Sequence, residues 1–285
     1  MYGVSSFSCK KAFNQGDVMF EQLMLGAIQG ITEWIPVSSK ACVIAAKIHF
    51  FKSGASLNEL INYALFLHLG TFFAAIVYFR DDIKHILTAM TAPRNAAPEG
   101  KKILVFLCIT TVLTALGQLL VNHVSALTHS MPHAKTALTS VIAALLIVAG
   151  FLQIKARGDG KRTPADLNIK DGVLLGLVQA AATLPGLSRA GTTMAALSFR
   201  NFDKEYTLKL SFLMSLPVIF IGNIVKNYHM LLTLGPEWIG VLAAFIVGIL
   251  TIGTLMNFAR RINFGVFLVF IGSILAIAVM TGALD

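Results

Sequence analysis

Two short polar segments interrupt apolar stretches of this chain, and they carry the residues best suited to chemistry. In the first segment Gln29 and Glu33 stand four positions apart, so a helix would present both on one face. Pro36 is expected to end that helix, and Ser38 and Ser39 to cap the next one. Because the free N–H groups at a helix N-terminus favour anions, this segment predicts an anion site beside a carboxylate.

The second polar segment repeats this arrangement about 150 residues later. Pro185 and Gly186 are expected to turn the chain, Ser188 to cap the following helix, and Arg189 to stand in its first turn. The planar guanidinium of arginine suits bidentate binding of phosphate, and the hydroxyl of Thr193 adds a hydrogen-bond donor. The second segment therefore predicts a phosphate clamp.

Charged side chains inside apolar sequence are costly at bilayer depth, so they mark a function or a specific partner. Glu33, Lys40 and Arg189 are such residues. If the two segments meet, two helix N-termini, two cations, several hydroxyls and one carboxylate face one cavity, which suits a phosphate or diphosphate on a lipid. The alternative is a purely structural ion pair between Glu33 and Arg189. His68 also lies in an apolar run, where we expect a packing histidine.

The composition is that of one membrane domain. Of the 285 residues, 56% are hydrophobic and 13% are charged, whereas a soluble domain is about a quarter charged. Residues 1–18 are expected to form a polar N-terminal arm and residues 19–285 the membrane domain. The net charge of +9 sits in short loops between apolar runs, which indicates membrane topology rather than nucleic-acid binding. The three cysteines show neither a pairing nor a metal-ligand spacing.

The expected fold is an all-α integral membrane protein with six transmembrane helices and two re-entrant helical hairpins. A bilayer core needs roughly 20 apolar residues per spanning helix. Residues 19–51 and 171–199 are broken by polar residues and proline, so each is expected to be a hairpin that is buried in protein. The six longer apolar runs are residues 58–79, 103–121, 137–154, 206–228, 237–256 and 264–281.

The chain also contains an internal repeat. Both hairpins carry the pattern L-G-x-x-Q followed by P-x-x-S-(K/R)-A, which begins at Leu25 in one and at Leu175 in the other. Three spans follow each hairpin, so the repeats, about residues 19–154 and 171–281, must be inserted in opposite orientations. Fourteen Lys and Arg residues then share one face and five share the other. The first face is therefore expected to be cytoplasmic, with both termini outside the cytoplasm.

At the two polar segments the chain resembles the undecaprenyl-diphosphate phosphatase family of the bacitracin-resistance type. The first family motif, (E/Q)-G-x-x-E-x-x-P-V-S-S-T-G-H, aligns with residues 29–42, which read Q-G-I-T-E-W-I-P-V-S-S-K-A-C. The second, P-G-x-S-R-S-x-x-T, aligns with residues 185–193, which read P-G-L-S-R-A-G-T-T. Asp171 fills a further family position, and the resemblance extends over about residues 19–281.

This resemblance implies removal of the terminal phosphate from a polyprenyl diphosphate in the inner (plasma) membrane, which recycles the lipid carrier for cell-envelope synthesis. It implies a divalent cation, Mg²⁺ or Ca²⁺, with Glu33 as its ligand or as an acid–base group. Ser39 becomes the candidate nucleophile, and Arg189 the residue that clamps the phosphates. The expected partners are the lipid and the bilayer, with a homodimer left open. The expected phosphate-binding residues are Gln29, Ser38, Lys40, Ser188 and Thr193.

Departures from the family pattern open an alternative function. The histidine that ends the first motif is Cys42 here, its Thr-Gly is Lys40-Ala41, and a serine of the second motif is Ala190. Histidine is the natural proton carrier of such a site, whereas a thiol in apolar surroundings is a poor base. We therefore expect phosphate binding to be kept and hydrolysis to be weakened or rearranged. The alternatives are a lipid-phosphate flippase, a non-hydrolysing binder of polyprenyl phosphate, and a transporter of soluble anions. A hydrolase is preferred because the resemblance covers most of the chain.

Overall fold

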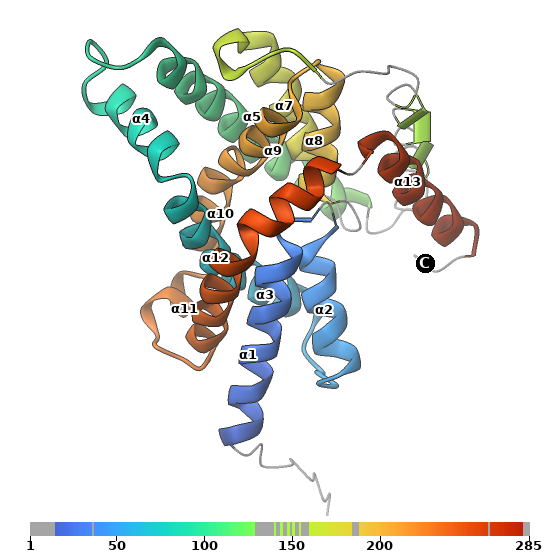
Figure 1. Cartoon of the computed structure of the whole chain (residues 1–285). Coiled ribbons are helices and arrows are strands. Elements are labelled where there is room, and N and C mark those ends of the chain that lie inside the picture. The colour runs from blue at the N-terminus through green and yellow to red at the C-terminus, as the bar shows by residue number, and fades with distance from the viewer. Residues whose placement is uncertain are drawn as a thin grey trace, which may run out of the picture.

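The structure, a computed structural model, describes residues 15–35, 37–128, 160–183, 188–261 and 263–281, with scattered positions from 140 to 154 (Figure 1). Every regular element among them is helical, apart from one isolated bridge between Arg162 and Phe202, so the all-α prediction is confirmed there. The elements are α1 (Gln15–Thr32), α2 (Ser39–His49), α3 (Leu57–Tyr78), α4 (Arg80–Thr91), α5 (Pro98–Thr128), η1 (Pro164–Asp166), α7 (Ile169–Ala181), α8 (Arg189–Phe199), α9 (Lys204–Leu213), α10 (Ser215–Lys226), α11 (Tyr228–Leu232), α12 (Glu237–Arg261) and α13 (Phe264–Met280).

Four stretches of helix are long and apolar enough to cross a membrane, and they match four of the predicted spans. They are Leu57–Tyr78, Pro98–Leu120, Lys204–Lys226 and Glu237–Phe258. The predicted run 264–281 forms α13, which has 17 residues and is shorter than a typical span. The predicted run 137–154 falls mostly outside the described residues. The chain is therefore a membrane protein with at least these four candidate spans.

Three details differ from the sequence-based expectation. The predicted span 206–228 is broken at Met214 because Pro217 has no N–H to donate to the carbonyl of Leu213. The connection after the first span is not a plain loop, since it forms α4 with Ile86 buried. At the other end α1 begins at Gln15, so the last four residues of the predicted arm 1–18 are helical, and residues 1–14 lie outside the described part of the chain.

Each broken region consists of two helices that pack against each other. We call α1 with α2 the first helix pair, and α7 with α8 the second helix pair. The hydroxyl of Ser38 accepts a hydrogen bond from the Ala41 N–H at 3.4 Å, and that of Ser188 accepts one from the Gly191 N–H at 3.2 Å. Ser38 and Ser188 are therefore confirmed as N-caps, whereas Ser39, which was also expected to cap, is the first residue of α2. The predicted turn residues Pro36, Pro185 and Gly186 lie outside the described residues.

The two helix pairs dock in a crossed manner on the opposite halves of the chain. Helix α1 runs along α12, which also packs along α3, whereas α7 runs along α5 (Figure 1). The glycine of each L-G-x-x-Q pattern lies at these contacts. A Cβ on Gly26 would lie 2.3 Å from the carbonyl oxygen of Gly240, and one on Gly176 would lie 2.8 Å from the Cβ of Leu113. The shared pattern thus marks two close helix contacts, as small residues do in membrane proteins.

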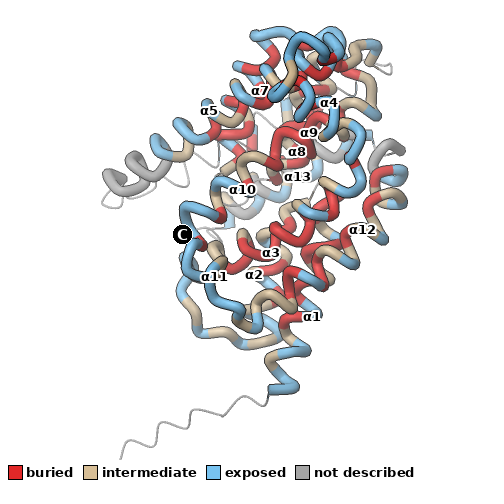
Figure 2. Tube along the Cα trace, turned by 90° about the vertical axis from the view of Figure 1, so that its left-hand side faces the viewer, coloured by how far each residue is buried: buried red, intermediate tan, exposed pale blue. Residues whose placement is uncertain are grey.

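The most buried parts of the chain lie in its interior, where α8 packs against α9 and where α3 packs against α12 (Figure 2). Large apolar side chains are instead exposed along the outer faces of the longest helices, for example Leu116 and Leu119 on α5 and Leu250 on α12. Exposed apolar surface of this extent indicates contact with lipid rather than water. The polar residues of both helix pairs therefore meet inside the protein, away from the expected lipid surface.

Candidate active site

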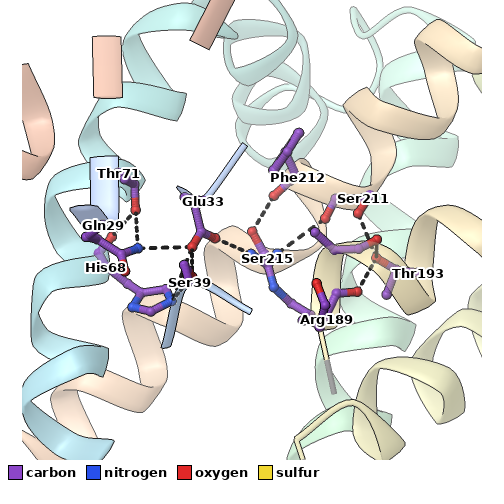
Figure 3. A network of polar contacts seen from close by, with 12 residues as sticks. Gln29, Glu33, Ser39, His68, Thr71, Arg189, Thr193, Ser211, Phe212 and Ser215 are labelled. Carbon is purple, nitrogen blue, oxygen red and sulfur yellow. Dashed lines mark hydrogen bonds and ion pairs between the residues drawn. The ribbon is translucent and has the colours of Figure 1, made fainter. Parts of the chain in front are cut away.

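A buried carboxylate lies where the two helix pairs meet (Figure 3). Glu33 follows the last turn of α1 and is 4% exposed. Its Oε2 accepts hydrogen bonds from Gln29 Nε2 at 3.0 Å and from Ser39 Oγ at 2.6 Å, and it lies 3.2 Å from His68 Nε2. Its Oε1 pairs with the guanidinium of Arg189. A carboxylate this deeply buried is stable only with such partners.

The ion pair between Glu33 and Arg189 joins the first copy of the internal repeat to the second copy. Arg189 is the first residue of α8, so its guanidinium stands beside that helix N-terminus. Ser39, on the other side of Glu33, is the first residue of α2. The prediction that the two polar segments meet is therefore confirmed, and two helix N-termini converge on one buried carboxylate (Figure 3).

Thr193 and Ser211 hold Arg189 in position through hydrogen bonds to its backbone and to its guanidinium. The Thr193 hydroxyl donates to the backbone carbonyl of Arg189 at 2.8 Å and lies 2.6 Å from the Ser211 hydroxyl. Nη1 of Arg189 donates to the carbonyl of Ser211 at 3.5 Å. Thr193 is fully buried, so in this arrangement it braces α8 against α9. Its predicted contact with phosphate stays a prediction.

Lys40 adds a second cation in the first turn of α2. Glu33, Arg189 and Lys226 are the charged groups that act on it. Among the described residues no carboxylate lies within ion-pair distance of its ammonium group. The site therefore carries more positive than negative charge, which favours an anionic ligand.

Comparison with known proteins identifies the family. Residues 22–278 match the family described as "Bacitracin resistance protein BacA". The chain belongs to this family. Proteins named undecaprenyl-diphosphatase are similar to it over most of their length. The one from Methanococcoides burtonii is 35% identical across 88% of this chain and 95% of the relative. The one from Saccharolobus solfataricus is 33% identical across 90% and 93%, and that from Syntrophotalea carbinolica is 32% identical across 84% and 89%.

His68 is buried with partners on both ring nitrogens, which agrees with the expected packing histidine. Its Nε2, however, lies 3.3 Å from Ser39 Oγ and 3.2 Å from Glu33, so it belongs to this cluster. The one sequence signal for this was an ionisable residue inside an apolar span. Cys42, which replaces the motif histidine, lies on α2 and makes none of the contacts of this cluster.

The second repeat reproduces the amide of the first but not its carboxylate. Nε2 of Gln29 donates to the hydroxyl of Thr71 at 3.3 Å, and Nε2 of Gln179 donates to the hydroxyl of Thr114 at 3.0 Å. The position four residues after Gln179 is Thr183, where the first repeat has Glu33. The two halves of the family fold are thus similar in packing and unequal in chemistry.

Asp171, the further family position, is a structural residue in this geometry. Its fully buried carboxylate accepts from Arg162 at 2.6 Å and from Arg200 at 2.7 Å. The hydrogen bonds that Arg162 donates to Asp171 raise the pKa of Arg162. Asp171 also accepts from the backbone N–H of Asn168, as the third residue of α7 in a capping box. It therefore ties the start of α7 to the end of α8.

The described residues do not by themselves form a resident cation site. They contain no group of three or more His, Cys, Asp and Glu side chains that could hold a metal ion. Both oxygens of Glu33 already accept from side-chain donors, and Arg189 and Lys40 place positive charge beside it. The predicted divalent cation, and Glu33 as its ligand, therefore stay predictions.

Proposed function

We propose that this protein is an integral membrane phosphatase that removes the terminal phosphate of a polyprenyl diphosphate, the carrier lipid of cell-envelope synthesis. The observation that carries this proposal is the buried cluster of Ser39, Glu33 and Arg189 between two helix N-termini. Three relatives that match more than four fifths of the chain bear the name undecaprenyl-diphosphatase. That name fits a site with an excess of cations inside a membrane protein.

The site offers separate groups for binding and for attack. Arg189 and Lys40 bind the two phosphates from the first turns of α8 and α2, where the backbone N–H groups also favour anions. The capping hydroxyls of Ser38 and Ser188 and the buried amide of Gln29 complete the polar wall. Oε1 of Gln29 has no partner among the residues that the structure describes, so it can accept a hydrogen bond from a water or from the substrate.

Ser39 is the proposed nucleophile. Its Oγ attacks the terminal phosphorus, the bond from that phosphorus to the bridging oxygen breaks, and the lipid monophosphate leaves. Water then attacks the phosphoserine, which releases inorganic phosphate and restores the serine. Arg189 stabilises the charge that develops on the phosphoryl oxygens, and Glu33 holds Ser39 and Arg189 in place.

The proposed setting is the inner (plasma) membrane, with six spans, two inverted repeats and both termini outside the cytoplasm. In this setting both helix pairs are re-entrant hairpins whose tips meet inside the bilayer. The crossed docking of α1 on α12 and of α7 on α5 supports the repeat. The excess of Lys and Arg in the loops of one face supports the orientation. A homodimer stays a prediction that cross-linking in membranes can test.

A divalent cation, if bound, would be held mainly by phosphate oxygens of the substrate, with Glu33 as the neighbouring carboxylate. Mg²⁺ is usually held by one or two carboxylates together with the phosphates of a substrate. Since the described residues offer one carboxylate that is already paired, the diphosphate oxygens are the better ligands. When bound there, the cation neutralises phosphate charge.

Phosphate release from a C15 or C55 prenyl diphosphate tests the function. Purified wild-type protein in detergent is expected to release inorganic phosphate with Mg²⁺ or Ca²⁺ present, and Ser39→Ala and Arg189→Ala to lose this activity. Ser198→Ala, on α8, is the matched control and is expected to behave like wild type. A silent wild type that still binds the lipid would favour the non-hydrolysing alternative.

A further inference from the structure

We infer that His68, which lies outside both polar segments of the repeat, takes the proton of Ser39 and returns it during the reaction. This inference rests on the proposed function. It assigns to α3 the proton carrier that the first motif lacks at Cys42. The argument uses the position of the imidazole ring, the groups on its two nitrogens, and the state of the neighbouring carboxylate.

The ring of His68 is held in a fixed orientation. Nδ1 lies 2.6 Å from the backbone carbonyl of Ala64, and because a carbonyl only accepts hydrogen bonds, Nδ1 carries the hydrogen. In the neutral ring Nε2 then bears the lone pair. That atom lies 3.3 Å from Ser39 Oγ. The serine hydrogen is directed to Oε2 of Glu33 at 2.6 Å in this structure, so the hydroxyl turns toward Nε2 of His68 before the proton is transferred. The ring itself is buried, so its orientation is not averaged by solvent.

Helix α3 positions the ring firmly. Two residues after His68, a Cβ on Gly70 would lie 2.3 Å from the carbonyl oxygen of Val241, so α3 and α12 are in backbone contact there. One residue further, the Thr71 hydroxyl donates to the carbonyl of His68 and accepts from Gln29. A catalytic group on such a packed helix keeps its geometry better than one on a loop.

Glu33 is better suited to stabilise the charged imidazole than to act as the base. Its Oε1 is paired with Arg189, and its Oε2 accepts from Gln29 and, before the reaction, from the Ser39 hydroxyl. A carboxylate that is neutralised in this way is a weak base. After His68 has taken the serine proton, however, Nε2–H points to Oε2 of Glu33 at 3.2 Å. The cluster therefore resembles a serine, histidine and carboxylate arrangement, in which the carboxylate supports the imidazolium.

The proton moves twice in the reaction. When Ser39 Oγ bonds to the terminal phosphorus, its proton passes to Nε2 of His68, and the imidazolium then gives that proton to the oxygen of the departing lipid phosphate. In the second half, His68 takes a proton from the attacking water, the bond between serine oxygen and phosphorus breaks, and the same proton returns to Ser39. One water is consumed and one phosphate is released.

The experiment compares His68→Gln with wild type in phosphate release from farnesyl diphosphate and in binding of a non-hydrolysable farnesyl bisphosphonate. We expect turnover to fall by about 100-fold or more while the analogue still binds with wild-type affinity. His49→Gln, an exposed histidine at the end of α2, is the matched control and should leave both quantities unchanged. Turnover within a few-fold of wild type in His68→Gln would overturn the inference. Loss of both turnover and binding would overturn it too, because it would assign His68 a structural role.

A second variant places the histidine base at position 42 instead of position 68. Position 42 is three residues after Ser39 on α2, so both side chains lie on the same face of that helix. Adding Cys42→His to His68→Gln is expected to restore at least part of the turnover, a gain that a structural role of His68 does not explain.

If His68→Gln cannot be purified in folded form, His68→Ala in native membranes replaces it. Turnover that rises with added imidazole supports the inference, and turnover that does not respond overturns it. A wild type that releases no phosphate is a different result, since it would refute the proposed function itself.

Discussion

The chemistry of this protein is concentrated in a cluster of side chains around Glu33. Gln29, Ser39, His68 and Arg189 reach this carboxylate from α1, α2, α3 and α8. The sequence motifs identify all of these residues except His68. His68 could not be assigned from the sequence because no local spacing links it to Ser39, and only the packing of α3 against the first helix pair brings them together. Cys42 is the opposite case. The sequence motif identified its position as functional, but in the structure Cys42 makes none of the contacts of the Glu33 cluster.

The pair of Glu33 with Arg189 allows a test of structural against catalytic roles. Glu33→Gln leaves the guanidinium buried without a counter-ion, so the free energy of unfolding is expected to fall by about 3–5 kcal/mol. The double variant Glu33→Gln/Arg189→Gln removes both charges and is expected to recover much of that stability but no phosphate release. Thermal unfolding in detergent and phosphate release measure the two effects. Recovery of activity with stability would mean that the pair is only structural.

Metal analysis of the purified protein distinguishes a cation that binds together with the diphosphate from a cation that is resident in the protein. Because the described residues contain no group of three or more His, Cys, Asp and Glu side chains that could hold a metal ion, protein purified without chelator is expected to contain a substoichiometric amount of Mg²⁺ or Ca²⁺. Phosphate release is expected to stop with chelator and to return when either cation is added, since the cation comes with the diphosphate. Tightly held, stoichiometric metal in the purified protein would instead support Glu33 as a ligand of a resident ion.

At the scale of the elements, the L-G-x-x-Q pattern sets how closely the helices approach. Its glycines lie against α12 and α5, and its glutamines bond to threonines of α3 and α5. The sequence predicted these broken helices and their caps correctly because proline, serine and glycine act locally. It did not predict α4 or the break at Met214, because these depend on how a polar connection and Pro217 are accommodated by neighbouring helices.

Gly26 provides a matched pair of substitutions within one helix. A Cβ at position 26 would lie 2.3 Å from the carbonyl oxygen of Gly240, which is backbone and cannot move alone. Gly26→Ala is therefore expected to lower the free energy of unfolding by about 1–3 kcal/mol. Gly16→Ala, on the same helix and with no described residue within 4 Å of the added Cβ, is the control and should be neutral or slightly stabilising. Equal effects in thermal unfolding would contradict the close contact of α1 with α12.

The whole molecule is the scale at which the inverted repeat matters. Four candidate spans and the family could be predicted from apolar runs and motifs, because both are properties of continuous sequence. The orientation of the two halves depends on parity, that is, on how many times each half crosses the bilayer. Crossed docking brings Arg189 of the second half to the Glu33 carboxylate of the first half, so the site is formed by both halves together.

Labelling of single cysteines in intact cells tests this parity. In a background without Cys9, Cys42 and Cys108, cysteine is introduced at Gly54, between α2 and α3, or at Leu234, between α11 and α12, both of which are exposed. Because the proposed halves are inverted and the first span of each ends on opposite faces, both sites are expected outside, where a membrane-impermeant maleimide reacts at once. Asn95→Cys, between α4 and α5, is the control and should react only after the cells are opened. If Gly54→Cys and Leu234→Cys react on different sides, one half has an even number of crossings. The two polar segments would then enter the membrane from the same face, and their meeting at Glu33 and Arg189 would need another explanation.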